Sequence, residues 1–203
     1  MLSQRPIRYI LSYKGMINMR LFIAINFNDD IKNNIMEIIE RIKQYAVQGR
    51  FVNKEHMHLT LEFLGEISEE RVEDIISAMK QISASPFVIS LSELGHFKRK
   101  DGNIYWLGIT GNKDLIDIQG MVHNLLMEKK FKLEEREYRP HITIGRRVKL
   151  MNTFDPGELK KSIGEIQIRI NSIDLIKSER INGKLIHTTI YSSTIKPIQE
   201  ECK

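Results

Sequence analysis

The sequence has a single cysteine, Cys202, close to its C-terminus. One cysteine excludes a disulfide framework within the chain and a zinc site built from cysteines, and we expect a reducing cytoplasm as its location. No apolar run approaches the ~18 residues that a membrane-spanning helix needs, so we expect no membrane association. The chain also lacks a dense cluster of carboxylates of the kind that holds two metal ions. We therefore expect a protein that uses neither a metal nor a cofactor.

Length and charge leave more room for interpretation. With 203 residues, the chain has enough material for one compact domain or two small lobes. The formal net charge of +5 favours a polyanionic partner, but a mildly basic cytosolic protein would have the same charge. Charge alone therefore does not decide between these two interpretations.

Two short stretches share one pattern, His-x-Thr-x with apolar residues at x. They begin at His58 and at His141, and their threonines are Thr60 and Thr143. Successive side chains of a strand point to opposite faces, so each His and Thr share one face and the apolar residues share the other. One such strand would be weak evidence, whereas two copies predict half-buried strands that show a base and a hydroxyl to a cleft.

The surrounding pattern predicts alternating strands and helices. Residues 20–25 form an apolar run typical of a buried strand. A helix with Asn28 or Asp29 as its N-cap is expected to run to Gly49, and a second helix is expected to begin at Ser68. The remaining expected elements are a strand at 87–97, a hairpin tip at 98–102, a strand at 104–109, a helix at 114–129, a helical turn near 159, a strand at 166–176, a turn at 182–183 and a strand at 185–191.

This order of elements occurs twice along the chain. His58 and His141 are separated by 83 residues, and the segments 20–25 and 104–109 are separated by 84. The duplication predicts an α+β fold of two pseudo-symmetric lobes around a central cleft, each a mainly antiparallel sheet with helices on its outer face. We expect one bilobal domain over residues 19–195, a dispensable N-terminal extension over 1–18 and a charged tail over 196–203.

The motifs resemble those of a known family. Paired His-x-Thr-x motifs in duplicated lobes are similar to the 2H phosphoesterase superfamily. The segments 19–25 (MRLFIAI), 58–65 (HLTLEFLG) and 138–146 (YRPHITIGR) resemble RNA 2',3'-cyclic phosphodiesterases, formerly called 2'-5' RNA ligases. The similarity extends from about Met19 to about Ser193 and therefore covers nearly the whole chain.

The resemblance implies metal-independent hydrolysis of a terminal 2',3'-cyclic phosphate to a 2'-phosphate. It makes His58 the proton donor to the leaving 3'-oxygen and His141 the proton acceptor for water. The residues themselves allow two histidines to share this work, because their unperturbed pKa near 6.5 lets one be neutral and one charged, but they do not separate acid from base. Thr60 and Thr143 are expected to donate to phosphate oxygens. Reversibility also allows weak 2'-5' ligation.

Three further residues of the motifs are less clear. Strict alternation would bury Arg146, so we expect the strand to bulge or end at Gly145 and to free Arg146 for the phosphate. Phe63 occupies the matching position in the first motif. It is either a core residue, which the sequence slightly favours, or a stacking surface for a base at the edge of the site. Alternation places Glu62 on the cleft face, where its carboxylate would repel phosphate.

Other candidates surround the motifs. Tyr138 and Arg139 precede the second motif and are expected to contact RNA at its mouth. The basic tip at 98–100 either holds an RNA backbone or is a solvated turn. His56 is a surface residue or a neighbour of substrate, and three other histidines are expected to be ordinary strand or helix residues: His96, His123 and His187.

The expected partner is RNA, or a nucleotide, that ends in a 2',3'-cyclic phosphate, and the expected state is a monomer. Two alternatives stay open from the sequence. One is a binding module of the same fold that holds a nucleotide or an RNA end without turnover. The other is a 2H enzyme for a different cyclic phosphate or for 2'-5' linked oligonucleotides.

Overall fold

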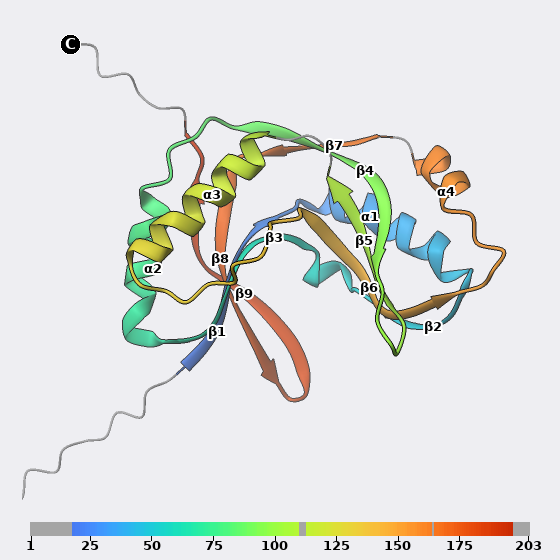
Figure 1. The fold of residues 1–203 in the computed structure, drawn as a ribbon, viewed down its shortest axis with the longest axis horizontal. Helices are drawn as coiled ribbons and strands as arrows, with labels where there is room; N and C mark the ends of the chain where they lie inside the picture. The colour runs from blue at the N-terminus through green and yellow to red at the C-terminus, as the bar shows by residue number, and fades with distance from the viewer. Residues whose placement is uncertain (1–17, 110–112, 164, 197–203) are drawn as a thin grey trace, which may run out of the picture.

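The computed structural model describes residues 18–109, 113–163 and 165–196. Two mainly antiparallel sheets lie next to each other, and helices pack against both of them (Figure 1). The predicted α+β class is therefore confirmed. The proposed extension at 1–18 and the charged tail fall almost wholly outside the described residues.

The first sheet has four strands in the order β3-β1-β8-β9. Its strands are β1 Asn18–Asn26, β3 His58–Ser68, β8 Ser172–Ile181 and β9 Lys184–Thr194. The second sheet has five strands in the order β2-β6-β5-β4-β7. Its strands are β2 Ala46–Phe51, β4 Phe87–Phe97, β5 Asn103–Ile109, β6 His141–Leu150 and β7 Ile166–Ile170. Each His-Thr motif thus begins a strand, one in each sheet.

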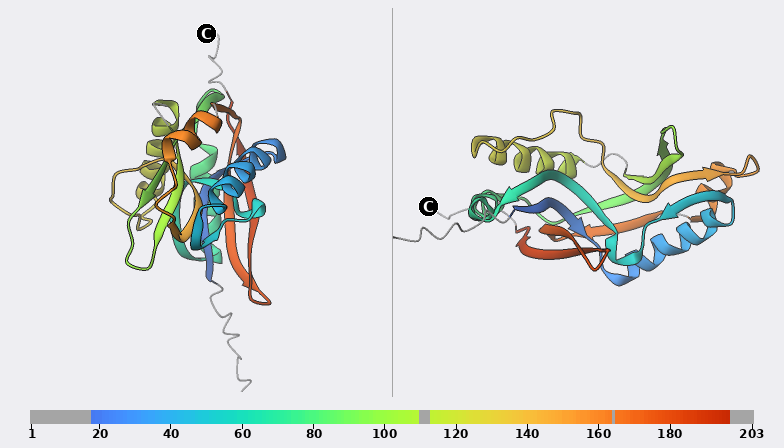
Figure 2. Two further views of the ribbon diagram at one scale, coloured as in Figure 1. Left: turned by 90° about the vertical axis from the view of Figure 1, so that its right-hand side faces the viewer. Right: turned by 90° about the horizontal axis from the view of Figure 1, so that it is seen from below.

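The helices divide between the two sheets. α2 (Val72–Lys80) and α3 (Lys113–Glu128) pack on the first sheet, whereas α1 (Asp29–Lys43) and α4 (Pro156–Ile163) contact strands of the second. In the side view, α3 and α1 lie on opposite sides of the molecule with the strands between them (Figure 2). Apolar stripes from these helices and from the inward faces of the strands form one large buried cluster. The 3-10 turns η1 Lys54–His56 and η2 Glu69–Arg71 flank β3.

The duplication appears in the strand orders. β3-β1-β8 in the first sheet corresponds to β6-β5-β4 in the second, because β1 matches β5 and β3 matches β6. The third strand of each set comes from the other half of the sequence. Each lobe is therefore built from both halves, an exchange that the comparison of the halves did not predict.

The first helix is shorter than the sequence predicted. Asn28 caps it as expected, since its Oδ1 accepts a hydrogen bond from the Ile31 N–H at 3.0 Å. The helix ends at Lys43 rather than at Gly49, and the following residues form β2 beside β6. Gly49 lies in that strand with φ of +141°, where a Cβ would lie 2.8 Å from Val148 Cα. Close approach of two strands, and not a helix end, is thus what requires this glycine.

Two more expectations need correction. The strand expected at 166–176 is two strands, β7 and β8, that separate at Asn171 and join different sheets. Ser68 precedes a 3-10 turn and its side chain makes no capping hydrogen bond. The turn at Asn182-Gly183 is confirmed, with positive φ at both residues. These two φ values suit the tight hairpin between β8 and β9.

Candidate functional site

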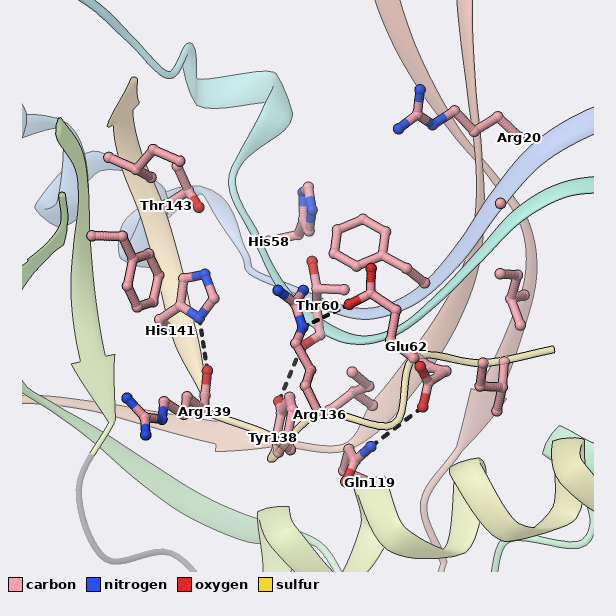
Figure 3. A pocket seen from close by; sticks show the side chains of 18 of the residues that line it. Arg20, His58, Thr60, Glu62, Gln119, Arg136, Tyr138, Arg139, His141 and Thr143 are labelled. Carbon is pink, nitrogen blue, oxygen red and sulfur yellow. Dashed lines mark hydrogen bonds and ion pairs between the residues drawn. The ribbon is translucent and has the colours of Figure 1, made fainter. Parts of the chain in front are cut away.

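A cleft of about 1080 Å³ receives side chains from both sheets. His58 and Thr60 line it from β3, and His141 and Thr143 line it from β6 (Figure 3). The two histidines face the cleft from different walls, as the duplication predicted. The structure thus brings both His-Thr pairs to one cavity.

The backbone two residues upstream interacts with both motif histidines. The Nδ1 of His141 is 2.7 Å from the carbonyl oxygen of Arg139, and the backbone of His56 acts to raise the pKa of His58. A carbonyl oxygen can only accept, so Nδ1 of His141 carries its proton. Its Nε2 therefore remains for chemistry in the cleft, with a lone pair when the ring is neutral.

A β-bulge follows each His-Thr pair. In the first sheet, Ile23 pairs with Glu62 and Ala24 pairs with Thr60, which leaves Leu61 without a partner. In the second sheet, Ile144 is skipped in the same way between Thr143 and Gly145. An extra residue shifts all following side chains to the opposite face of a strand. The bulge expected at Gly145 is thus present, and it has a twin in β3.

The bulge in β3 corrects the expected position of Glu62. Glu62 shares the face of Ile23 and is only 6% exposed, although it borders one end of the cavity. Its Oε2 lies 2.8 Å from Nδ1 of His123 and 3.3 Å from Nε2 of Gln119, both on α3. Figure 3 shows the Glu62 carboxylate directed at Gln119, away from the two motif histidines. The carboxylate therefore does not oppose a phosphate there.

The same bulge brings Phe63 to the cleft face. Phe63 pairs with Phe22, lines the cavity and is 45% exposed, so the slight preference for a core position was wrong. Arg146 occupies the equivalent position in β6 and is also exposed in the cleft. Its charge lowers the pKa of both His58 and His141, so it lies near both rings. A guanidinium in that place suits an anion held between the histidines.

Aromatic rings pack against each histidine. The ring of His58 lies 4.7 Å from that of Phe22 and 5.3 Å from that of His187, measured between centroids. His141 has Phe97 at 5.3 Å and Trp106 at 6.1 Å. Each imidazole is thus packed into its wall, which limits the rotation of the ring.

Two histidines have more prominent places than the sequence suggested. His187 on β9 lines the cleft and contacts His58, so its interpretation as an ordinary strand residue was wrong. His56 also lines the cleft, and its buried Nδ1 has no hydrogen-bond partner among the residues that the structure describes. The turn at 182–183 sets the register that places His187 opposite Ser178. That register was readable from the sequence, but the pairing of β8 with β1 was not.

Burial depresses the pKa values of these histidines. It is the main cause that lowers the pKa of His58 to about 4, followed by the nearby His187. Burial is also the main cause that lowers the pKa of His141, ahead of Arg136 and Arg146. It also lowers the pKa of His187 to about 4. Both shifts favour the neutral form of the motif histidines.

The residues before the second motif line the mouth of the cleft. The hydroxyl of Tyr138 donates to the carbonyl of Thr60 at 3.0 Å and so joins this segment to the first sheet. Burial, followed by Glu62, raises the pKa of Tyr138. The guanidinium of Arg139 is exposed and forms an ion pair with Glu137 at 3.1 Å. Both residues lie where the sequence placed them.

Two arginines of the cleft, Arg20 and Arg136, were not singled out from the sequence. Arg20 lines it from β1, and Arg136 lines it from the segment before β6, where it pairs with Glu134. From the basic hairpin tip, Arg99 reaches the cavity. His96 and His123 lie on a strand and a helix as expected. The sequence around Arg20 and Arg136 does not indicate that they line a cleft, because a cleft between two sheets depends on pairing between distant strands.

The described part of the chain has neither a metal-binding cluster nor a membrane-spanning helix. Among its residues, no group of three or more His, Cys, Asp or Glu side chains is arranged to hold a metal ion. None of its helices is long and apolar enough to cross a membrane.

Comparisons with known proteins agree with this fold. The family model of LigT-like phosphoesterases matches residues 25–106. The RNA 2',3'-cyclic phosphodiesterase of Thermotoga maritima is 34% identical over 88% of this chain and 89% of that protein. The protein of the same name from Methanocaldococcus jannaschii is 32% identical over 88% of this chain and 94% of its own. The Escherichia coli LigT complex with 3'-AMP superposes with a TM-score of 0.74, at 25% identity over 88% of this chain and 99% of that one.

The fold and the paired histidines define a phosphoesterase of the LigT-like, two-histidine class. Within that class, the chain belongs to the RNA 2',3'-cyclic phosphodiesterase family. The resemblance noted in the sequence is therefore confirmed at the level of family and fold.

Proposed function

We propose that this protein hydrolyses a 2',3'-cyclic phosphate at the end of RNA to a 2'-phosphate, without a metal ion. The observation that carries the proposal is the arrangement of His58 and His141. The two side chains enter one cleft from opposite sheets, and the His141 ring is hydrogen-bonded to the backbone carbonyl of Arg139. The curated relatives from Thermotoga maritima and Methanocaldococcus jannaschii carry the name of this activity.

The reaction needs one proton removed and one supplied. A water oxygen attacks phosphorus while Nε2 of His141 takes its proton. The bond between phosphorus and the 3'-oxygen breaks, and the 3'-oxygen takes the proton of His58. The product has a 2'-phosphomonoester and a free 3'-hydroxyl, and two histidines on opposite sides of the phosphorus can perform both transfers at once.

Three neighbouring groups would stabilise the charge that develops on the phosphate. Thr60 and Thr143 each lie two residues after the histidine of their own motif, and both line the cleft. Arg146 adds a full positive charge close to both rings. Donors fixed in this way need no rearrangement as the transition state forms, which is the main source of such stabilisation.

The depressed pKa values fit a site that is completed by its substrate. An anionic phosphate between the rings would offset the charge of Arg146 and raise the pKa of the neighbouring histidines. His58 could then bind the proton that it donates, although burial lowers its pKa to about 4. Substrate binding would therefore bring the acid into its working protonation state.

The remaining expectations from the sequence fit this proposal. Phe63 would stack on a base, and Arg139 would contact RNA at the mouth of the cleft. Tyr138 would act by joining the two walls, since its hydroxyl is bound to Thr60. We further propose a monomer whose working domain spans residues 19–195.

An assay with 2',3'-cyclic nucleotides and short RNAs that end in a cyclic phosphate, carried out in excess EDTA, tests the proposal. We expect turnover to persist in EDTA. His58→Ala and His141→Ala should each lower kcat by about 10²–10⁴-fold. His96→Ala, which changes an exposed histidine outside the cleft, is the matched control and should retain activity. Loss of turnover in EDTA, or full activity of either motif variant, would overturn the mechanism.

A sulfur-substituted substrate separates the acid from the base. When sulfur replaces the bridging 3'-oxygen, the leaving group is a thiolate, which departs without a proton because thiols have a pKa near 8.5. This substrate should restore much of the activity of His58→Ala and little of that of His141→Ala. The reverse pattern would exchange the two roles.

A further inference from the structure

The roles proposed for the two histidines determine along which wall of the cleft the RNA lies. This inference rests on the proposed function. Attacking and leaving oxygens stand roughly in line on opposite sides of phosphorus. The leaving 3'-oxygen belongs to the terminal ribose and lies on the side of His58. The ribose and the RNA before it must therefore extend along the wall of the first sheet, and water enters from the wall of the second.

A row of rings leads along the first sheet away from His58. The Phe22 ring lies 4.7 Å from His58, and the Phe63 ring lies 6.0 Å from Phe22, between centroids. Phe22 is buried and fixes the row, whereas Phe63 is 45% exposed and lines the cleft. An exposed ring on a cavity wall is a platform for a nucleobase of any type.

Arg20 lies further along the same face. It shares that face of β1 with Phe22, because the two are separated by two positions. The strand position opposite His58 is Asn26, so Arg20 lies about 20 Å further along β1 at ~3.3 Å per residue. Arg20 is exposed, lines the cleft and, among the described residues, has no ion-pair partner. Its guanidinium is thus available to an anion beyond the first nucleotide.

The wall formed by the second sheet also carries an aromatic ring beside its histidine and an arginine further away. Phe97 packs on His141, and Arg99 lies at the tip of the hairpin between β4 and β5. If RNA ran along this wall, the water that attacks phosphorus would have to come from the side of His58. The two walls therefore make different predictions for the two arginines.

We propose that the upstream RNA lies along the first sheet, with the terminal base on Phe63 and a preceding phosphate on Arg20. The cleft is then a site for an oligonucleotide end. A cyclic mononucleotide fills only the part near the two histidines and Phe63, and it leaves Arg20 without a ligand.

The experiment compares two substrates with the same terminal base, a cyclic mononucleotide and a trinucleotide that ends in a cyclic phosphate. We expect the trinucleotide to have the higher kcat/KM in the native protein. Arg20→Gln should lower the kcat/KM of the trinucleotide relative to that of the mononucleotide. It should also reduce the slope of log kcat/KM against log salt concentration for the trinucleotide by about one unit. Phe63→Leu should lower kcat/KM for both substrates by about tenfold, because both carry the terminal base.

Two matched arginine variants serve as controls. Arg99→Gln changes the other wall and should leave the ratio as it is. Arg169→Gln changes an exposed arginine on β7 outside the cleft and should change nothing. A ratio that falls with Arg99→Gln and not with Arg20→Gln would overturn the proposal and place the RNA on the second sheet. Equal losses for both substrates with Arg20→Gln would also overturn it.

Binding of a trinucleotide that ends in a 2'-phosphate, followed by fluorescence anisotropy, tests the same path without turnover. Arg20→Gln should weaken this binding and lower its salt dependence, whereas Arg99→Gln should do neither. A protein that turned over neither substrate would contradict the proposed hydrolysis, and the binding measurement would still decide where the RNA lies.

Discussion

The half-buried position of His58 makes the stability of the protein sensitive to acid. Folding lowers the pKa of His58 from 6.5 to about 4. Between these values the unfolded chain binds a proton that the folded chain does not, so a falling pH favours unfolding. The stabilising contribution is complete above pH 6.5 and is lost as the pH falls toward 4.

The size of this effect follows from the two pKa values. With 6.5 in the unfolded chain and about 4 in the folded protein, His58 alone should lower the free energy of unfolding by about 2 kcal/mol between pH 8 and pH 5. His187 has a pKa shift of the same sign, but its ring is less buried, so its contribution should be smaller. The free energy of unfolding of the native protein should therefore fall by more than the contribution of His58 alone.

Urea unfolding at pH 8 and pH 5 measures this contribution. His58→Gln cannot take up the proton, so its loss of unfolding free energy between the two pH values should be about 2 kcal/mol smaller than that of the native protein. Any change in stability that the substitution causes at both pH values cancels in this comparison. The control His96→Gln changes an exposed position, so its free energy of unfolding should fall by as much between the two pH values as that of the native protein. If the free energy of unfolding of His58→Gln fell by as much as that of the native protein, folding would not lower the pKa of His58.

Two further substitutions test the walls of the cleft. Glu62→Ala should lower the free energy of unfolding by about 1–3 kcal/mol, since it leaves His123 without its buried partner, and KM should stay the same. A fall in KM would instead mean that the carboxylate faces the phosphate. Tyr138→Phe removes the hydrogen bond to Thr60 and should cost about 0.5–1.5 kcal/mol in urea unfolding. An unchanged unfolding free energy would show that this bond does not join the walls.

The cleft-facing residues of the paired motifs could be predicted from the sequence because the motifs precede the β-bulges of their strands. From His58 to Thr60 and from His141 to Thr143 the alternation is regular, so the cleft face was predictable. Beyond Thr60, the unpaired Leu61 inverts the alternation. The bulge that was inferred from Gly145 applies equally to the first motif, and it would have placed Glu62 and Phe63 correctly.

Other parts of the site depend on contacts between distant segments. His187 reaches His58 only because β8 pairs with β1 in the first sheet. Nothing near His187 in the sequence specifies this pairing. The end of α1 was misjudged for a related reason, because Gly49 serves the close approach of β2 to β6. Local pattern gives elements, whereas the exchange of strands between the halves depends on tertiary packing.

That exchange also explains why the two histidines need both halves of the chain. β1 lies between β3 and β8, and β5 lies between β6 and β4. A first half alone would leave one edge of β1 without its partner and would lack the strand that carries His187. The second half would likewise leave one side of β5 unpaired. Because an isolated pair of strands is only marginally stable in water, we expect each wall of the cleft to need the strand that the other half supplies.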